Sequence, residues 1–559
     1  MKSIKFVAFF ILALALILVS CTPKATEAPV EEEAAPVEEE AAPVEEEAAP
    51  VEEEVVEEEP MAESHTLVIA MNTGDLMTLD PAWAGEATNM FIHANVYQQL
   101  VNFDPADINT PLPSLAESWE AEEGATDFTF HLRPDVLFSS GNPFTAKDVA
   151  FSWMRGKNMQ NWFFDPIDSF EIIDDLTIKV HLAFPSADFM AIVSIPGFGI
   201  TDSELVKEHG GTDAEGAFET DTAKEWLDQN SAGTAPYVMT SWAPKAEVVF
   251  ELNPNYWGDT PYYDRVIIKH VEDPTTMLQM LQKGDVDIVP SLNIDLVEMA
   301  QADDSLNVVV SNTFDINYLA MTSNCATATG PETAALLCQK EVRQAVVAGI
   351  DYDGLIDAVL MGYGTRAPSI IPVGMMGVDP SKVEGRDVEK AKALLEAAGY
   401  GDGITLDLFY AVTPERDVIS AKIKNDLAEV GITVNLNPLE ETVYLDQMRA
   451  QELPFCFGGW VPDYLDVTLW TDYYSSIENG IAFRMWFDNA RAAELKGLIK
   501  GEVVQETREA YVEELQDIWM EEAPFTMLYQ KQTIAAMNSD LKGYAYHPAH
   551  WLHVWDLTK

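Results

Sequence analysis

Positive charge is scarce in this chain of 559 residues. Lysine and arginine together number 33, against 93 aspartates and glutamates, so the formal net charge is -60 at pH 7. A protein that binds nucleic acid needs a positive surface for the phosphates, so this balance argues against nucleic acid as a partner. The excess of acid favours solubility and cationic ligands. A host adapted to a salty environment would give the same composition.

Histidine is also scarce, and the short signatures of enzymes are missing. The nine histidines show no metal-binding spacing, and His547 and His550 lie in an aromatic tail that we expect to pack as structure. The chain has no HExxH, Walker A, GxSxG or CxxC motif, which mark metalloproteases, P-loop proteins, α/β-hydrolases and thiol redox proteins. We therefore expect no metal, no cofactor and no catalytic activity.

Long apolar runs are missing except at the N-terminus. Residues 6–19 are almost wholly apolar and follow Lys2 and Lys5. A transmembrane helix needs about 20 apolar residues, so this shorter run indicates a secretory signal. It ends in Leu-Val-Ser-Cys, which resembles the bacterial lipobox, whose cysteine is acylated and becomes the mature N-terminus. We expect an exported protein held by lipid on Cys21 to the outer face of a membrane; a plain signal peptide with an incidental cysteine is the alternative.

A repeat of seven residues follows the signal. Prolines at 29, 36, 43 and 50 are each followed by Val-Glu-Glu-Glu. The prolines break any continuous helix, the repeat lacks the apolar seam of a coiled coil, and the glutamates repel one another. Residues 21–64 are therefore predicted to be a disordered tether.

Cysteine is scarce as well, with four in the chain. Cys325 and Cys338 are close together in a polar segment, and an exported protein can form disulfides, so we predict that they are bonded. Such a short closed loop adds roughly 3 kcal/mol to stability in the chain-entropy model. Cys456 lies in the apolar stretch PFCFGGW and is predicted to be a buried thiol.

Residues 65–559 have the pattern of folded domains. The chain is 47% hydrophobic, and this length predicts two or three domains. Residues 65–72 alternate like a strand, and Asp174-Asp175 marks the turn of a hairpin. Thr145 is a good N-cap for a helix from Ala146. Beyond residue 341, helices alternate with the strands ITLDLFYA and ITVNLNPLE, which indicates an α/β domain.

Several long motifs carry a resemblance to a known family. They are LAESWE followed by TDFTFHLRPDVLFSSGNPFTAKDVAFSW, LDPA at residues 79–82, GTAPYVMTSW followed by ELNPNYWGDTPYYDRV, VRQAVVAGIDYDGLI, and GGWVPDYLDV. In this order they resemble the extracytoplasmic solute-binding proteins, family 5, of ABC transporters, which include the oligopeptide- and dipeptide-binding proteins. The resemblance extends from about residue 66 to 555.

The resemblance implies an α/β fold of the type II periplasmic-binding-protein class, with two lobes joined by a hinge and an extra inserted domain. The first lobe would comprise residues 65–100, 232–316 and 525–559. The inserted domain would comprise residues 101–231, and the second lobe residues 317–524. The chain would cross between the lobes near Ile316–Leu319 and Tyr529.

The resemblance also implies a site between the lobes. The family's Trp-x-x-Asp motif matches Trp460 to Asp463, which makes Asp463 the expected partner of a peptide's amino group, with Asp466 as a substitute. The loop after Asp80 would line the cleft from the other lobe through Trp83, Gly85 and Glu86. Asn317 and Tyr318 at the crossing are further candidates. Aromatic residues at 470, 473 and 474 have the spacing of a helix and are predicted to be core rather than ligand contacts.

The expected function is that of a monomeric receptor, anchored by lipid, that captures oligopeptides or dipeptides and delivers them to an ABC permease in the same membrane. The same fold binding an oligosaccharide or another small solute is the alternative. Nickel is disfavoured because the histidines do not cluster. A surface-anchored hydrolase is disfavoured by the missing catalytic motifs.

Overall fold

The computed structural model describes residues 65–83, 85–477, 485–549 and 551–559. The predicted signal, Cys21 and the tether therefore lie outside the described residues. Everything below belongs to the compact unit Glu63–Lys559. Among the described helices, none is both long and apolar enough to span a bilayer.

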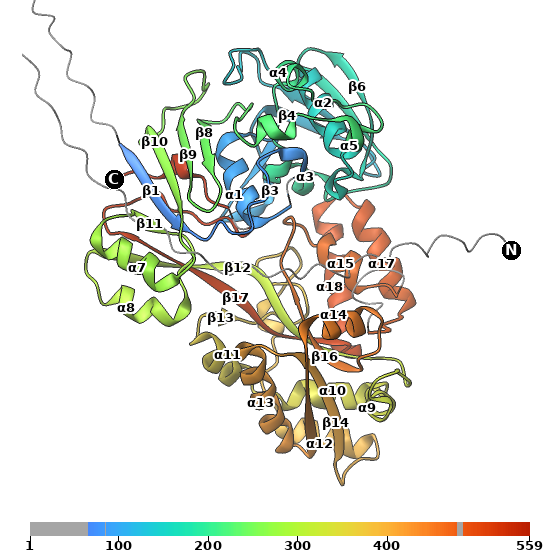
Figure 1. Ribbon diagram of the computed structural model, residues 1–559. Coiled ribbons are helices and arrows are strands. Elements are labelled where there is room, and N and C mark those ends of the chain that lie inside the picture. Colours follow the sequence, from blue (N-terminus) through green and yellow to red (C-terminus); the bar gives the residue numbers. More distant parts are fainter. Residues whose placement is uncertain (1–64, 84, 478–484, 550) are drawn as a thin grey trace, which may run out of the picture. The chain divides into compact units, whose positions relative to one another are not determined.

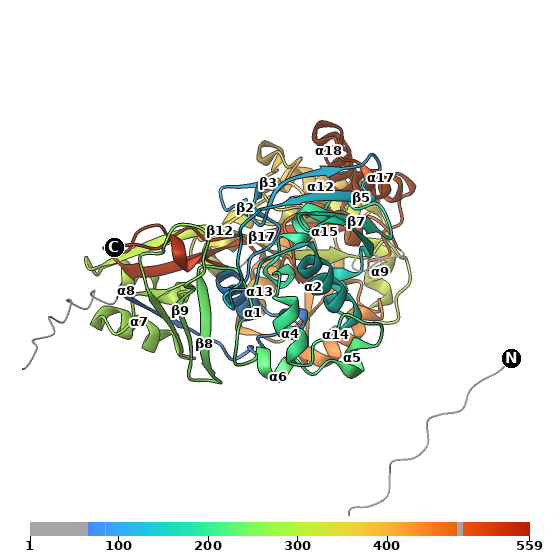
Figure 2. The ribbon, with the colours of Figure 1, turned by 90° about the horizontal axis from the view of Figure 1, so that it is seen from above.

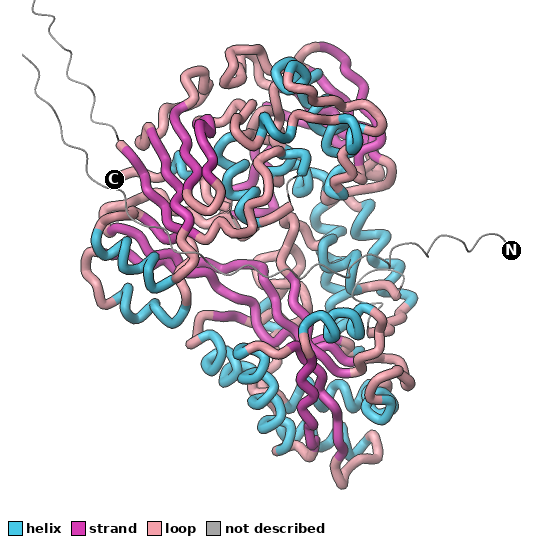
Figure 3. Tube along the Cα trace, in the orientation of Figure 1, coloured by secondary structure: helices cyan, strands magenta, loops and turns pink. Residues whose placement is uncertain are grey.

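An eleven-stranded mixed sheet organises this unit (Figures 1 and 3). Its strands, in spatial order, are β15 (Ile432–Leu439), β14 (Ile404–Ala411), β16 (Phe455–Trp460), β12 (Leu306–Met321), β17 (Phe525–Asn538), β11 (Ile288–Val289), β1 (Thr66–Met71), β10 (Arg265–His270), β9 (Glu247–Leu252) and β8 (Tyr237–Ala243), with β13 (Gly364–Thr365) paired to β17. The strand predicted at 65–72 is confirmed as β1.

The antiparallel pair of β12 and β17 lies at the centre of this sheet. It pairs Leu306 with Asn538 at one end and Ala320 with Phe525 at the other, and its register shifts between Asn312 and Ile316. On one side of the shift the pair is flanked by β11, and on the other side by β16. The predicted crossing residues lie within this pair.

Parallel strands stand on both sides of the central pair. β1 is parallel to β10 and β11, and β14 is parallel to β15 and β16. β14, helix α13 (Pro414–Ala428) and β15 form the βαβ unit that the sequence predicted. Helices of the β1 side are η1 (Pro81–Trp83), α1 (Ala87–Val96), α7 (Pro274–Lys283), η4 (Ile294–Leu296), α8 (Val297–Gln301) and η6 (Val554–Asp556).

Two smaller sheets fall within residues 101–231. One pairs β2 (Val101–Asp104) with β3 (Asp107–Pro113), and the other has the order β4 (Ala116–Ala121), β5 (Asp127–Leu132), β7 (Thr177–Leu182), β6 (Ile167–Asp174). The predicted hairpin is confirmed, because β6 and β7 are antiparallel and turn at Asp174. The helices here are α2 (Ala146–Asn158), η2 (Trp162–Phe164), α3 (Phe189–Val193), η3 (Pro196–Phe198), α4 (Ser203–Glu208), α5 (Ala217–Thr220) and α6 (Lys224–Leu227).

Helix α2 begins as predicted. Thr145 is its N-cap, and the backbone N–H of Thr145 donates to the carboxylate of Asp148 at 2.9 Å in a capping box. The helix lies against the four-stranded sheet (Figure 2). The ring of Trp153 on this helix lies 6.2 Å from that of Phe130 on β5. The cap fixes where the helix starts, so the apolar side chains face the sheet.

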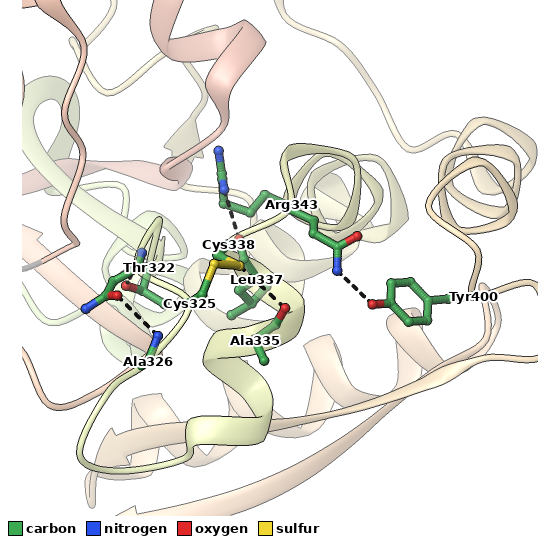
Figure 4. Close-up of a disulfide and its surroundings, with 10 residues drawn as sticks. Thr322, Cys325, Ala326, Ala335, Leu337, Cys338, Arg343 and Tyr400 are labelled. Atoms are coloured by element: carbon green, nitrogen blue, oxygen red, sulfur yellow. Dashed lines mark hydrogen bonds between the residues drawn. A yellow bond between two sulfur atoms is a disulfide. The ribbon is translucent and has the colours of Figure 1, made fainter.

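Helices surround the β14 end of the main sheet. They are α9 (Pro331–Leu337), α10 (Lys340–Gly349), α11 (Tyr352–Leu360), η5 (Pro380–Lys382), α12 (Val388–Ala397), α13 (Pro414–Ala428), α14 (Glu441–Arg449), α15 (Thr468–Tyr474), α17 (Ala490–Gly501) and α18 (Gln505–Glu522). The predicted disulfide is confirmed: Cys325 and Cys338 are bonded with a Cα–Cα distance of 4.9 Å (Figure 4). Cys456 is a buried thiol on β16, also as predicted.

Candidate ligand-binding site

The Trp-x-x-Asp loop leaves the main sheet where β16 ends. Trp460 pairs with Ile316 and Gly459 with Asn317, so the loop begins beside the central strand pair. A Cβ on Gly458 would clash with the ring of Tyr318, so glycine is needed for β16 to lie this close. Asp463 lies three residues after Trp460. The loop therefore starts next to Ile316, where the chain is predicted to cross between the lobes.

Asp463 carries a partly buried carboxylate with no hydrogen bond or ion pair to any described residue. Burial alone raises its pKa to about 6, because the charged form has lost water without gaining a cation. A buried carboxylate is normally paired. A cation supplied from outside the chain would restore the missing interaction.

Asp466, unlike Asp463, has partners for its carboxylate. Its carboxylate accepts hydrogen bonds from Arg508 of α18 at 2.8 and 2.5 Å and from the backbone N–H of Thr468 at 2.8 Å. These bonds fix the loop to α18, and the guanidinium of Arg508 compensates the negative charge of Asp466. The hypothesis that Asp466 substitutes for Asp463 is therefore not supported by this geometry.

Aromatic rings flank Asp463. The ring of Trp460 lies 5.1 Å from that of Tyr473, and the charge of Asp463 adds to burial in raising the pKa of Tyr473. The indole Nε1 of Trp460 is buried with no acceptor among the described residues. Trp470 and Tyr474 are fully buried, as predicted for core residues, whereas Tyr473, also predicted to be core, is only partly buried.

Arg416 at the start of α13 is a further candidate site residue, which sequence reasoning missed. Its Nη2 donates to the side-chain oxygen of Asn317 at 3.0 Å, and its guanidinium lies 4.9 Å from the Phe457 ring centroid. Its Nη1 is buried with no acceptor among the described residues. Arg416 Nη1 therefore has no acceptor among the described residues, just as the carboxylate of Asp463 has no donor there.

The topology explains why these two charges share one edge. β14 and β16 are parallel, so their carboxyl ends lie at the same edge of the sheet. Arg416 follows β14 and Asp463 follows β16. Ligands of open α/β sheets bind outside the carboxyl ends of the strands. That rule, applied to the arginine after ITLDLFYA, is the signal that would have found Arg416.

The two candidates at the crossing are buried. Asn317 is 8% exposed and orients Arg416. Tyr318 is 2% exposed, with its ring 5.7 Å from Tyr474 and 5.8 Å from Phe525. Tyr318 is therefore a core residue here, because its position in β12 points it beneath β16 rather than toward the edge.

The candidates after β1 lie apart from Asp463. Trp83 contacts Phe218 at 5.4 Å, Glu86 is the N-cap residue of α1, and Gly85 is exposed. Among the described residues, no hydrogen bond, ion pair or ring contact joins them to Asp463. Their role stays a prediction.

The loop that carries these candidates is anchored by a buried ion network. Asp80 is fully buried and receives two hydrogen bonds from Arg155 of α2 at 2.7 and 2.6 Å. Arg155 also donates to Asp221 at 2.7 and 2.9 Å. The aspartate of LDPA thus has a structural role: it holds the first lobe's loop against residues of the predicted inserted domain.

Two partly buried charged side chains, each with a polar atom that lacks a partner among the described residues, follow strands at the carboxyl edge of the sheet, where ligands of open α/β sheets bind. Residues 110–480, more than half of the chain, match the model of bacterial extracellular solute-binding proteins, family 5. The chain belongs to this family. It is therefore an exported solute-binding protein, as the sequence resemblance implied.

Relatives match over most of their length. The probable D,D-dipeptide-binding periplasmic protein DdpA of Escherichia coli (strain K12) is 27% identical over 495 residues, which are 86% of this chain and 92% of the relative. The dipeptide-binding protein of the same strain is 26% identical over 490 residues, covering 81% and 87%.

Solved structures share the fold. HbpA2 from Haemophilus parasuis has a TM-score of 0.78 at 24% identity, covering 88% of this chain and 99% of that one. DppA from Helicobacter pylori, in complex with the peptide STSA, has a TM-score of 0.65 at 23% identity, covering 88% and 98%. The predicted two-lobed α/β fold with an additional domain is confirmed.

Proposed function

We propose that this protein is the lipid-anchored receptor of an ABC importer and that its ligand is a short peptide with free ends. The observation that carries the proposal is the unpaired, partly buried carboxylate of Asp463, which follows β16 at the same edge of the sheet as Arg416 after β14. Relatives named as dipeptide-binding proteins, and a neighbour solved with a peptide, support the ligand class.

A zwitterionic peptide suits this pair of charges. Its ammonium group would take Asp463 as partner, and its terminal carboxylate would accept from Arg416. Charge-assisted hydrogen bonds of this kind are about twice as strong as neutral ones. The indole Nε1 of Trp460 offers a further donor for a peptide carbonyl. A neutral oligosaccharide would leave both charges unpaired, so it is the weaker candidate.

The first lobe would complete the site. Trp83, Gly85 and Glu86, held by the Asp80–Arg155 network, are proposed to line the cleft opposite Asp463. The central pair of β12 and β17 is the proposed hinge, because its register shift lies between the flanking strands of the two lobes. Hinge closure around a ligand is the usual mode of such two-lobed proteins.

Delivery requires the receptor to stay close to its permease. Lipid on Cys21 would hold a monomeric receptor at the membrane, and the tether of residues 21–64 would let it reach the permease. We assign the protein no catalytic activity. Cys21→Ser should release the protein into the soluble fraction of cells; retention in the membrane would overturn the anchor.

Calorimetric titration tests the ligand class. We expect the purified protein to bind a mixed pool of short peptides and to ignore a pool of oligosaccharides. Binding of oligosaccharides alone would overturn the peptide proposal, and hydrolysis of any ligand would overturn the assignment of no catalytic activity.

Two variants test the charges separately. Asp463→Asn should weaken binding of free-amine peptides by at least about tenfold while sparing N-acetylated ones. Arg416→Gln should weaken peptides with a free carboxylate and spare C-terminally amidated ones. Arg449→Gln, at an exposed position on α14, is the matched control. Equal losses for blocked and unblocked peptides would remove the residue concerned from the site.

A further inference from the structure

The predicted inserted domain contacts the Asp463 loop through a buried carboxylate. Asp188, just before α3, is 2% exposed. Its Oδ2 accepts from the hydroxyl of Thr468 at 2.6 Å and from the hydroxyl of Tyr464 at 3.2 Å. Its Oδ1 accepts from the hydroxyl of Ser186. The inserted domain is therefore hydrogen-bonded to two side chains that closely follow Asp463 in the chain.

The local structure of α3 does not explain this carboxylate. Asp188 is the N-cap residue of α3, but its side chain accepts no hydrogen bond from the backbone of that helix. An N-cap aspartate usually accepts from one of the first N–H groups of its own helix. The carboxylate of Asp188 instead accepts from the first residue of α15 and from the loop before it. Its hydrogen bonds thus serve the boundary between the inserted domain and the second lobe.

The hydroxyl of Thr468 lies between two carboxylates and has one hydrogen to donate. It is closer to Asp188, at 2.6 Å, than to Asp466, at 2.9 Å. Asp466 also accepts from Arg508 and from the backbone N–H of Thr468. A buried carboxylate is costly unless it is hydrogen-bonded, so the hydrogen of Thr468 contributes more at Asp188, whose listed partners are all hydroxyl groups.

Backbone and side-chain contacts beside Asp188 hold it in place. The N–H of Ala187 donates to the carbonyl oxygen of Lys500 in α17 at 2.8 Å. The ammonium group of Lys500 lies 5.1 Å from the ring centroid of Phe184 and bonds to Asp472 of α15 at 2.6 Å. Residues 184–188 are therefore held against α15 and α17.

The Asp463 loop is thus fixed on both sides of Asp463. Before it, Trp460 pairs with Ile316 of β12. After it, the hydroxyl of Tyr464 bonds to Asp188. Fixed flanks leave the segment between them less freedom to lose when a ligand binds, and such preorganisation raises affinity.

We propose that Asp188 is a positioning residue of the ligand-binding site. Through Tyr464 and Thr468 it holds the carboxylate of Asp463 where the ammonium group of a peptide can reach it. The inserted domain contributes to affinity in this way without contacting the ligand itself. The inference rests on the proposed peptide-binding function and adds a residue of a third domain to it.

The first test compares free and blocked peptides. Asp188→Asn keeps the size of the side chain, but its amide nitrogen cannot accept a hydrogen bond. Calorimetric titration should show the variant binding trialanine about 3- to 10-fold more weakly than the wild type, because Asp463 is present but less well placed. N-acetyl-trialanine, which has no ammonium group, should bind both proteins about equally. Asp168→Asn, at an exposed position on β6, is the control and should change neither affinity.

A double variant separates positioning from a general loss of structure. When Asp463 is already asparagine, Asp188→Asn should cause no further loss of affinity for trialanine, because the effects of residues that act as one unit do not add. Additive losses in the double variant, or equal losses for trialanine and N-acetyl-trialanine in Asp188→Asn, would overturn the positioning role alone. Failure of trialanine to bind the wild type would overturn the proposed function and this inference together.

A milder variant keeps the inference testable if Asp188→Asn does not fold. Tyr464→Phe keeps the ring and removes one of the hydroxyl donors. It should weaken trialanine by at least about twofold and spare N-acetyl-trialanine. Tyr262→Phe, at a partly buried position in the first lobe, is the matched control. Wild-type affinity for trialanine in Tyr464→Phe would overturn the contact.

Discussion

At the scale of single residues, Asp463 faces two opposing demands. Binding a cation requires a charged carboxylate, whereas the unliganded fold disfavours the charge. Burial raises the pKa from 3.8 to about 6, so the native state holds more protons than the unfolded state between these values. Stability therefore falls as pH rises through this window.

This linkage gives a prediction for Asp463→Asn. At pH 7 the variant should be more stable than the unliganded wild type by about 3 kcal/mol, because the unpaired charge is gone. Below pH 3.8 the difference should vanish, since both states of the wild type are then protonated. Urea unfolding at the two pH values measures this. Asp466→Asn should destabilise instead, because it removes the partner of Arg508; a loss of stability in Asp463→Asn at pH 7 would contradict the argument.

Arg155 differs from Asp463 because its buried charge is paired with two carboxylates, those of Asp80 and Asp221. Arg155→Met would leave Asp80 and Asp221, both with fully buried side chains, without their cation. Breaking a buried ion pair costs about 3–5 kcal/mol, so we expect a large fall in the free energy of unfolding. Chemical denaturation checks this, with Lys382→Met in the exposed pair with Asp517 as the control. A small effect in Arg155→Met would mean that water reaches the two carboxylates.

At the scale of elements, the sequence predicted the strand, the helix cap and the turn that depend on residues close together in the chain. The alternation of residues 65–72, the Thr145 cap and the Asp174 turn each depend on near neighbours, and each is found in the structure. Arg416 and Tyr318 depend on which strands become neighbours. Their roles follow from β16 pairing with β12 and lying parallel to β14, which no local pattern encodes. The family motif could single out Asp463 as a candidate because that loop is short and contiguous.

The disulfide connects two elements, and its contribution to the free energy of unfolding can be measured. It joins the segment after β12 to the end of α9. Replacing both Cys325 and Cys338 by serine should lower the free energy of unfolding by about 3 kcal/mol. A reducing agent should lower the unfolding midpoint of the wild type and leave that of the double variant unchanged. Equal sensitivity of the two proteins to the reductant would point to another cause.

At the scale of the whole molecule, the proposed hinge predicts a change of size. A short peptide should reduce the radius of gyration as the lobes close, and small-angle X-ray scattering measures this. Asp463→Asn at the same peptide concentration should stay extended, because its affinity is lower. An unchanged radius in the wild type at saturating peptide would mean that binding needs no closure.

The central strand pair also governs how the protein comes to be folded. β1 pairs with β10, Thr66 beside Arg265, and β12 pairs with β17, Leu306 beside Asn538. Such distant pairings make folding slow. The main sheet cannot be completed until residues 525–538 are available, so its unpaired strand edges are open to aggregation until then. Among the described strands of the main sheet, β17 comes last along the chain, so the strand that joins the two sides of the sheet is also the one that completes it.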